Sequence, residues 1–108
     1  MNEDARMETA RKLLAHHLDD RGRLKLLPAK RKTKIAALYY LSTKLEKGKS
    51  YTEAELNDRL DAWSLFHDPA TLRREMYNLR LLDREPHGRA YWLEAEAPAL
   101  PELDADKA

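Results

Sequence analysis

The chain has 108 residues, of which 43% are hydrophobic and 36% are charged, with a net charge of +1 and no cysteine. This length suits one domain with one core, and the lack of cysteine excludes disulfides, thiolate zinc sites and a cysteine nucleophile and favours a cytoplasmic location. Because the first residues are charged and no long apolar run follows, we expect neither a secretion signal nor a membrane span.

Residues 1–20 have the pattern of one amphipathic helix, in which apolar side chains recur at helical spacing between residues 4 and 18. These apolar positions are Met7, Ala10, Leu14 and Leu18. Asp19, Asp20 and Gly22 are expected to break the helix. Leu24 and Leu26 then alternate with charged residues, which predicts a short half-buried strand before Pro28.

A second helical pattern begins at Ala29 and ends at Gly48, with an apolar stripe at Ile35, Leu38, Leu41 and Leu45. The helix opens with four cations that we call the basic run, Lys30, Arg31, Lys32 and Lys34. Residues 21–49 hold ten basic residues and one acid, a charge of +9. Cations at a helix N-terminus oppose the helix dipole, so the basic run is either a phosphate-contacting surface or a solvated helix end that aids solubility.

Two short helices follow, and each has a recognisable start. Thr52 and Glu55 predict a capping box, in which each side chain binds the other residue's free backbone amide. Asp68 and Pro69 predict an N-cap and a first helical residue for the next helix. The expected core-facing side chains are Leu56, Leu60 and Trp63 in the first helix and Leu72, Met76 and Leu79 in the second.

Residues 81–85 and 89–93 flank a Pro86-His87-Gly88 turn and predict a β-hairpin. The remaining segment, residues 95–108, is acidic and contains two prolines. It has too few apolar groups to offset the entropy lost on ordering, so we expect a disordered acidic tail over 95–108.

This order of elements predicts a mainly helical fold with a small β-hairpin, a winged helix-turn-helix domain at residues 21–94 preceded by the helix of residues 1–20. In such folds the second helix of the helix-turn-helix enters the DNA major groove, and the hairpin lies along the adjacent groove or backbone. With Leu72, Met76 and Leu79 turned inward, the outer face of that helix consists of Ala70, Arg74 and Tyr77, bordered by Asn78.

These residue types suit base reading, because arginine can grip guanine, asparagine can grip adenine, and alanine permits close approach. Arg73 projects sideways, towards a phosphate or towards Glu53 or Glu55. The candidate DNA-binding residues are Lys30, Arg31, Lys32, Lys34, Ala70, Arg73, Arg74, Tyr77, Asn78, Arg84, His87 and Arg89. An ordinary polar surface is the alternative for each group, and the aromatic residues Trp63, Phe66, Tyr91 and Trp92 are assigned to core packing rather than to base stacking.

Several short motifs extend from about Gly22 to Trp92: Gly22-Arg23-Leu24, Leu27-Pro28, Lys30-Arg31-Lys32, the stretch from Tyr51 to Asn57, His67-Asp68, Leu72-Arg73-Arg74, Leu81 to Arg84, and Gly88 with Tyr91-Trp92. Together they resemble a bacterial domain family of unknown function, found alone or fused to regulator-type helix-turn-helix domains. The resemblance implies a winged-helix fold and a regulatory setting, and it assigns no reaction or binding residue. Family members tend to have glycine at the position of Arg80, which implies a left-handed backbone there that disfavours arginine.

We therefore predict a bacterial transcriptional regulator that binds duplex DNA through the helix of Leu72 and Met76. The alternative is a winged-helix protein-interaction module or a dimerising accessory domain without DNA binding, and the first helix is the surface a second copy would use unless it packs on the core. No enzyme activity, cofactor or small-molecule ligand is expected, since phosphate loops and nucleophile elbows are absent. No metal is expected either, because the adjacent His16 and His17 diverge on a helix.

Overall fold

The computed structural model describes residues 3–96 and 98–104, which form a mainly helical fold with one small sheet. Its elements in chain order are α1 (Glu3–Leu13), α2 (Arg31–Ser42), α3 (Glu53–Ala62), α4 (Pro69–Asn78), β1 (Leu82–Arg84), β2 (Tyr91–Leu93) and α5 (Pro101–Asp104). The element order confirms the prediction of a mainly helical chain with a small β-hairpin. Among the described residues, no helix has the length and apolar character needed to cross a membrane.

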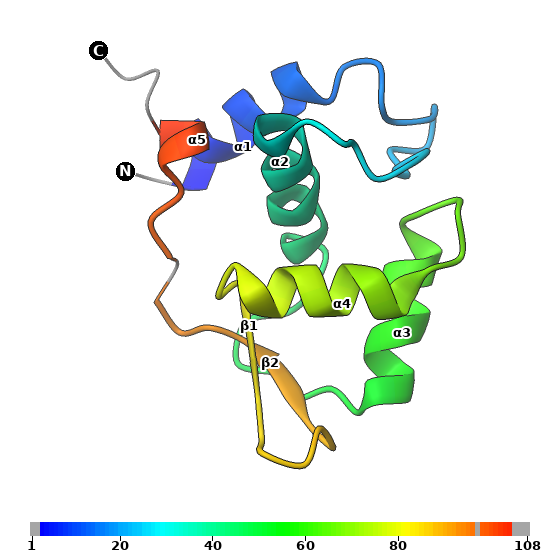
Figure 1. Ribbon diagram of the computed structural model, residues 1–108, viewed down its shortest axis with the longest axis vertical. Helices are drawn as coiled ribbons and strands as arrows, with labels where there is room; N and C mark the ends of the chain where they lie inside the picture. The colour runs from blue at the N-terminus through cyan, green and yellow to red at the C-terminus, as the bar shows by residue number, and fades with distance from the viewer. Residues whose placement is uncertain (1–2, 97, 105–108) are drawn as a thin grey trace.

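Helix α2 is the centre of the molecule, with α1 and α5 packed near its start and α4 crossing it (Figure 1). Every residue from Ile35 to Ser42 is buried, so the helix is enclosed on all sides after its first turn. The predicted stripe, which ends at Leu45, is buried as expected. Burial of the two tyrosines in this helix goes beyond that stripe, because α1, α4 and α5 cover different faces of it.

Helix α1 ends at Leu13, five residues before the predicted end at Leu18. Leu18 instead pairs with Leu24 in an isolated antiparallel bridge, and Leu24 also pairs with Ser64. The strand predicted around Leu24 and Leu26 is reduced to this one residue, and Leu26 is exposed. Backbone pairing of Leu18 with the nearby Leu24 therefore replaces the last turn of the predicted helix.

The apolar stripe predicted for the first helix is covered by the chain itself. Ala10 and Leu14 are fully buried, and Met7 and Leu18 pack against the core. Their neighbours include α2 and α5, which both contact α1. This is the core packing that the sequence offered as the alternative to a dimer surface.

Helices α3 and α4 begin as predicted. The Thr52 hydroxyl accepts a hydrogen bond from the Glu55 amide at 3.1 Å, and the Glu55 carboxylate accepts one from the Thr52 amide at 2.9 Å. Asp68 caps α4 by accepting a hydrogen bond from the Thr71 amide at 3.3 Å. The core-facing residues of α4 are as predicted, with Leu72 and Met76 fully buried and Leu79 partly buried.

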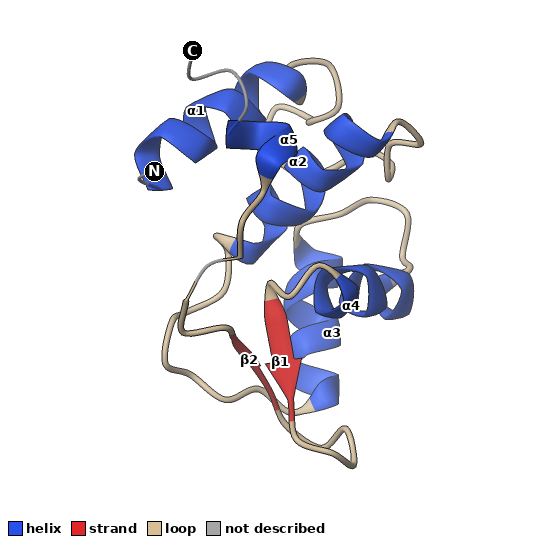
Figure 2. Cartoon of the chain, turned by 60° about the vertical axis from the view of Figure 1, so that its left-hand side comes forward, coloured by secondary structure: helices blue, strands red, loops and turns tan. Residues whose placement is uncertain are grey.

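The predicted hairpin is confirmed, with Asp83 opposite Trp92 in an antiparallel register. A third segment joins it, because Tyr51 and Tyr91 exchange backbone hydrogen bonds of 2.7 and 2.8 Å. These bonds tie the start of α3 to β2. Figure 2 shows the hairpin at the lower end of the molecule, away from α1 and α5.

The prediction of a disordered tail over residues 95–108 is wrong for the part that the structure describes. Leu100 and Leu103 are 2% and 0% exposed, and α5 packs against α1 and α2. Arg6 donates two hydrogen bonds to the Asp104 carboxylate, at 3.0 and 2.8 Å, and one to the Pro98 carbonyl at 2.9 Å. The two buried leucines and the contacts of Arg6 therefore order the segment, whereas its average composition indicated disorder. Residues 97 and 105–108 lie outside the described residues.

Arg80 ends α4 in the left-handed conformation that the family resemblance implied, with φ of +66°. Its amide donates to the Tyr77 carbonyl and the Leu81 amide donates to the Met76 carbonyl, each at 3.0 Å. This is the Schellman pairing, in which glycine is usual because a Cβ costs about 1 kcal/mol. We expect Arg80→Gly to raise the free energy of unfolding by about 1 kcal/mol in urea titrations.

The control is Arg59→Gly, which replaces an exposed arginine inside α3. That change should lower the free energy of unfolding by up to about 1 kcal/mol, because glycine is a poor helix former. A similar destabilisation by both changes would show that the Arg80 backbone is not left-handed.

Candidate nucleic-acid interface

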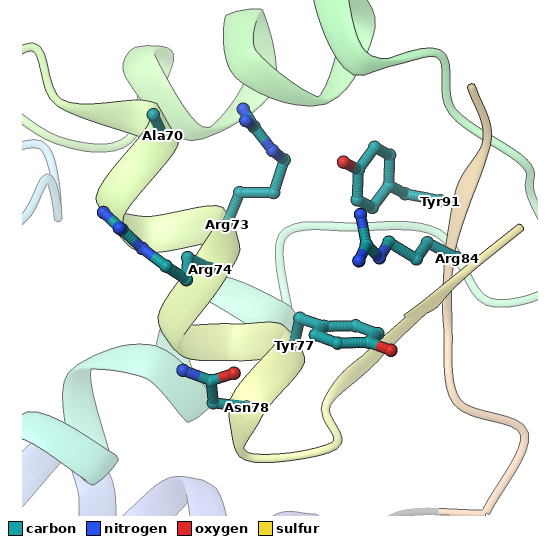
Figure 3. Close-up of a pocket in the computed structure, with 7 residues that line it drawn as sticks. All are labelled: Ala70, Arg73, Arg74, Tyr77, Asn78, Arg84 and Tyr91. Carbon is teal, nitrogen blue, oxygen red and sulfur yellow. The ribbon is translucent and has the colours of Figure 1, made fainter. Parts of the chain in front are cut away.

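Helix α4 and the hairpin border an open pocket of about 450 Å³ (Figure 3). Its lining residues are Ala70, Arg73, Arg74, Tyr77, Asn78, Arg84 and Tyr91. All of them except Tyr91 are candidate DNA-binding residues from the sequence. The fold thus brings the candidates of α4 together with one candidate from β1.

The exposed face of α4 consists of Ala70, Arg74 and Asn78, which follow one another at intervals of four residues. Figure 3 shows Arg74 and Asn78 pointing away from the hairpin on the same side of the helix. Within residues 3–96 and 98–104, no carboxylate lies at ion-pair distance from the Arg74 guanidinium. A cation and an amide are therefore presented side by side to a ligand.

Tyr77 and Arg84 lie across the pocket from this face and contact each other. The Arg84 guanidinium lies 4.9 Å from the centroid of the Tyr77 ring. Hydrogen bonds with Tyr77 and then with Tyr91 raise the pKa of Arg84 above its ordinary value. Arg84 therefore connects the hairpin to α4 through a cation–π contact.

Arg73 points to α3, and its side chain is only 18% exposed. It donates a hydrogen bond to the Asn57 side chain, and its Nη2 lies 3.9 Å from a Glu53 carboxylate oxygen. Its guanidinium also lies 5.7 Å from the Tyr91 ring centroid. In the free chain Arg73 thus contacts Asn57 and Glu53 of α3 and the Tyr91 ring, and so links α3, α4 and β2.

Tyr91 is the one lining residue that the sequence did not select. Its placement in the core is correct, since the residue is 4% exposed. The hydroxyl nevertheless lies close to the hairpin turn, because a Cβ on Gly88 would be 3.5 Å from it. The alternating pattern of β2 predicts the buried ring, and nothing in that pattern identifies the arginines around it.

The basic run lies at the start of α2, outside the pocket. Arg31 donates a hydrogen bond from Nε to a Glu102 carboxylate oxygen at 2.9 Å. The Lys34 ammonium lies 3.6 Å from a Glu75 carboxylate oxygen, which places the first turn of α2 beside α4. Lys30 and Lys32 are exposed. Arg31 and Lys34 of the basic run therefore have carboxylate partners in the same chain.

The remaining candidates, His87 and Arg89, are exposed in the hairpin turn and do not line the pocket. The Arg89 amide donates a hydrogen bond to the Glu85 carboxylate. That bond is the main cause of the lowered pKa of Glu85, which is further lowered by the amide and charge of His87. The turn therefore presents two basic side chains around one ionised carboxylate.

In a comparison with known protein families, the chain matches a family described as "Uncharacterized protein conserved in bacteria (DUF2087)" over residues 23–93. This span is more than half of the chain and includes α2, α3, α4 and the hairpin, hence the whole candidate interface. It leaves out α1 and α5. Neither the curated proteins nor the solved structures gave a match.

Proposed function

The chain belongs to the bacterial DUF2087 family, and we propose that it is a winged helix-turn-helix protein that binds duplex DNA as a transcriptional regulator. The observation that carries the proposal is the exposed face of α4, where Arg74 and Asn78 are free of the contacts that hold Arg73 and Arg84. The element order also supports it: a helix, an extended residue at Tyr51, two helices joined by a turn, and a hairpin paired with Tyr51.

In the proposed complex, α4 lies in the major groove with its exposed face towards the bases. Arg74 donates to the two acceptors of a guanine, and Asn78 pairs with an adenine. Four helical residues rise about 6 Å, nearly two base-pair steps of about 3.4 Å, so these side chains reach bases about two steps apart. Ala70 allows close approach of the helix N-terminus, whose dipole favours a nearby phosphate.

The flanks of α4 supply phosphate contacts in this arrangement. The hairpin turn extends from the pocket with His87 and Arg89, and the basic run lies beside α4 through the Lys34–Glu75 contact. Such contacts set position and affinity and carry no sequence information. Affinity should therefore fall steeply with salt, while sequence preference depends on Arg74 and Asn78.

The experiment is fluorescence anisotropy of the full chain with labelled mixed-sequence duplexes over a range of salt concentrations. We expect the logarithm of the association constant to fall linearly with the logarithm of salt, and Lys30→Gln to reduce the slope by up to about one unit without changing sequence preference. The matched control is Lys12→Gln, since Lys12 is an exposed lysine of α1. Absence of binding to every duplex at low salt would refute the proposal.

One observation favours the protein-interaction alternative. Helix α3 carries four carboxylates, Glu53, Glu55, Asp58 and Asp61, against the single cation Arg59. A negative helix next to α4 repels phosphate and suits a basic protein surface. A dimer would need a contact surface other than the apolar stripe predicted for the first helix, because that stripe is already packed in the core. A constant monomer mass in light scattering over a dilution series would exclude the dimer.

A further inference from the structure

The C-terminal segment lies against the helix that carries the basic run. Leu100 and Leu103 anchor it in the core, and Arg6 holds the Asp104 carboxylate. These contacts fix α5 next to the start of α2. Glu102, between the two anchoring positions, is therefore held at a defined place rather than carried by a free tail.

Glu102 forms an ion pair with Arg31, one of the cations of the basic run. The Arg31 side chain is 74% exposed and the Glu102 side chain 24% exposed, and their facing atoms are 2.9 Å apart. The pKa of Glu102 is lowered by its own backbone amide and by Arg31, so the carboxylate is ionised at neutral pH. An ion pair open to solvent on one side adds little to stability. Its main consequence is that Arg31 already has an anionic partner.

We propose that α5 is an intramolecular competitor of DNA, in which Glu102 holds Arg31 in the free protein and a backbone phosphate replaces it in the complex. This inference rests on the proposed function and adds its regulation. It follows from the chemistry of the two acceptors, because carboxylate and phosphate oxygens bind the same guanidinium face. Any event that displaces α5 would then strengthen binding to DNA.

The competition has a signature in the salt dependence. When a phosphate displaces Glu102 from Arg31, one ion pair forms and another is lost, so Arg31 contributes almost no net release of counterions. Without the carboxylate, the same contact releases a counterion and steepens the slope by about 0.9. The Arg31–Glu102 pair must be broken before the phosphate binds. The usual stabilisation by an exposed pair therefore lowers the affinity for DNA by up to about fivefold.

The test is the salt dependence of duplex binding by the full chain carrying Glu102→Gln, measured by anisotropy. We expect affinity about two- to fivefold higher at low salt and a slope steeper by about 0.9 than for the unmodified chain. Glu96→Gln removes the same charge from an exposed position of the same segment and should not change the slope. The double variant Arg31→Gln, Glu102→Gln should lose the gain.

Equal slopes for the unmodified chain and Glu102→Gln would overturn the competition while leaving DNA binding intact. A gain that persists in the double variant, or appears equally in Glu96→Gln, would also overturn it, since the effect would then be one of overall charge. Absence of duplex binding by all variants refutes the proposed function, and the competition with it. Urea unfolding of Glu102→Gln checks that α5 remains docked.

Discussion

Replacing Arg74 with alanine is expected to lower affinity for the preferred duplex by about tenfold or more, since one good paired contact to guanine is worth about 1–3 kcal/mol. The loss should be much smaller on a scrambled duplex, because α4 would then be held by phosphate contacts alone. The preferred sequence is first obtained by selection from a random pool. Anisotropy titrations on both duplexes then measure the ratio of the two affinities.

The matched control is Arg59→Ala, which removes an arginine from the exposed surface of α3. It should leave the ratio of affinities unchanged. An equal loss on both duplexes for Arg74→Ala would mean that Arg74 contacts a phosphate. Unchanged binding on both would place the exposed face of α4 outside the interface.

Replacing Arg6 with alanine is expected to lower the free energy of unfolding by about 2–3 kcal/mol. The Arg6 side chain is 9% exposed and that of Asp104 is 23% exposed, so the change leaves a partly buried carboxylate without its cation. It also removes the bond to the Pro98 carbonyl, which holds the segment leading to α5. The measurement is urea unfolding followed by tryptophan fluorescence at neutral pH.

The control is Lys12→Ala, which breaks the exposed pair between Lys12 and Glu8 in α1. Exposed helical pairs contribute about 0.3–0.5 kcal/mol, so this change should be several times smaller. Comparable effects of the two changes would contradict the structural role of the Arg6–Asp104 pair.

The same pair predicts a pH dependence. A hydrogen bond from Arg6 lowers the pKa of Asp104 in the folded protein, against the opposing effect of burial. A lowered carboxylate pKa stabilises the fold above the unfolded-state pKa of about 3.9, and this stabilisation is lost as pH falls through the folded-state pKa. Asp104→Asn should therefore be less stable than the unmodified chain at neutral pH, and the difference should shrink below about pH 4.

The two arginines of α4 show how the sequence and the structure divide the candidate interface. Helical spacing places Arg74 opposite Leu72 and Met76, and the structure agrees. Spacing also makes Arg73 a lateral residue, but it does not decide between a phosphate and a carboxylate as its partner. That choice depends on where α3 lies, because the contacts of Arg73 are with Asn57 and Glu53.

The C-terminal segment shows the limit of composition as a guide. Its residues are mostly small, acidic or proline, which indicates disorder on average. Two buried leucines and the Asp104 carboxylate nevertheless dock it on the rest of the fold. The partner of that carboxylate, Arg6, lies 98 positions away in the chain.

The sequence by itself determined the features that depend on neighbours within one or two turns: the capping box at Thr52, the inward face of α4 and the hairpin. Tertiary structure decided which of the candidate cations are already bound, since Arg31 meets Glu102 and Arg84 meets Tyr77 only after α2, α5 and the hairpin have packed. The physical reason is the distance along the chain between the residues that determine each feature. Helix periods and caps are set by local backbone geometry, whereas an ion pair across 71 residues exists only when the buried leucines on both sides bring its two ends together.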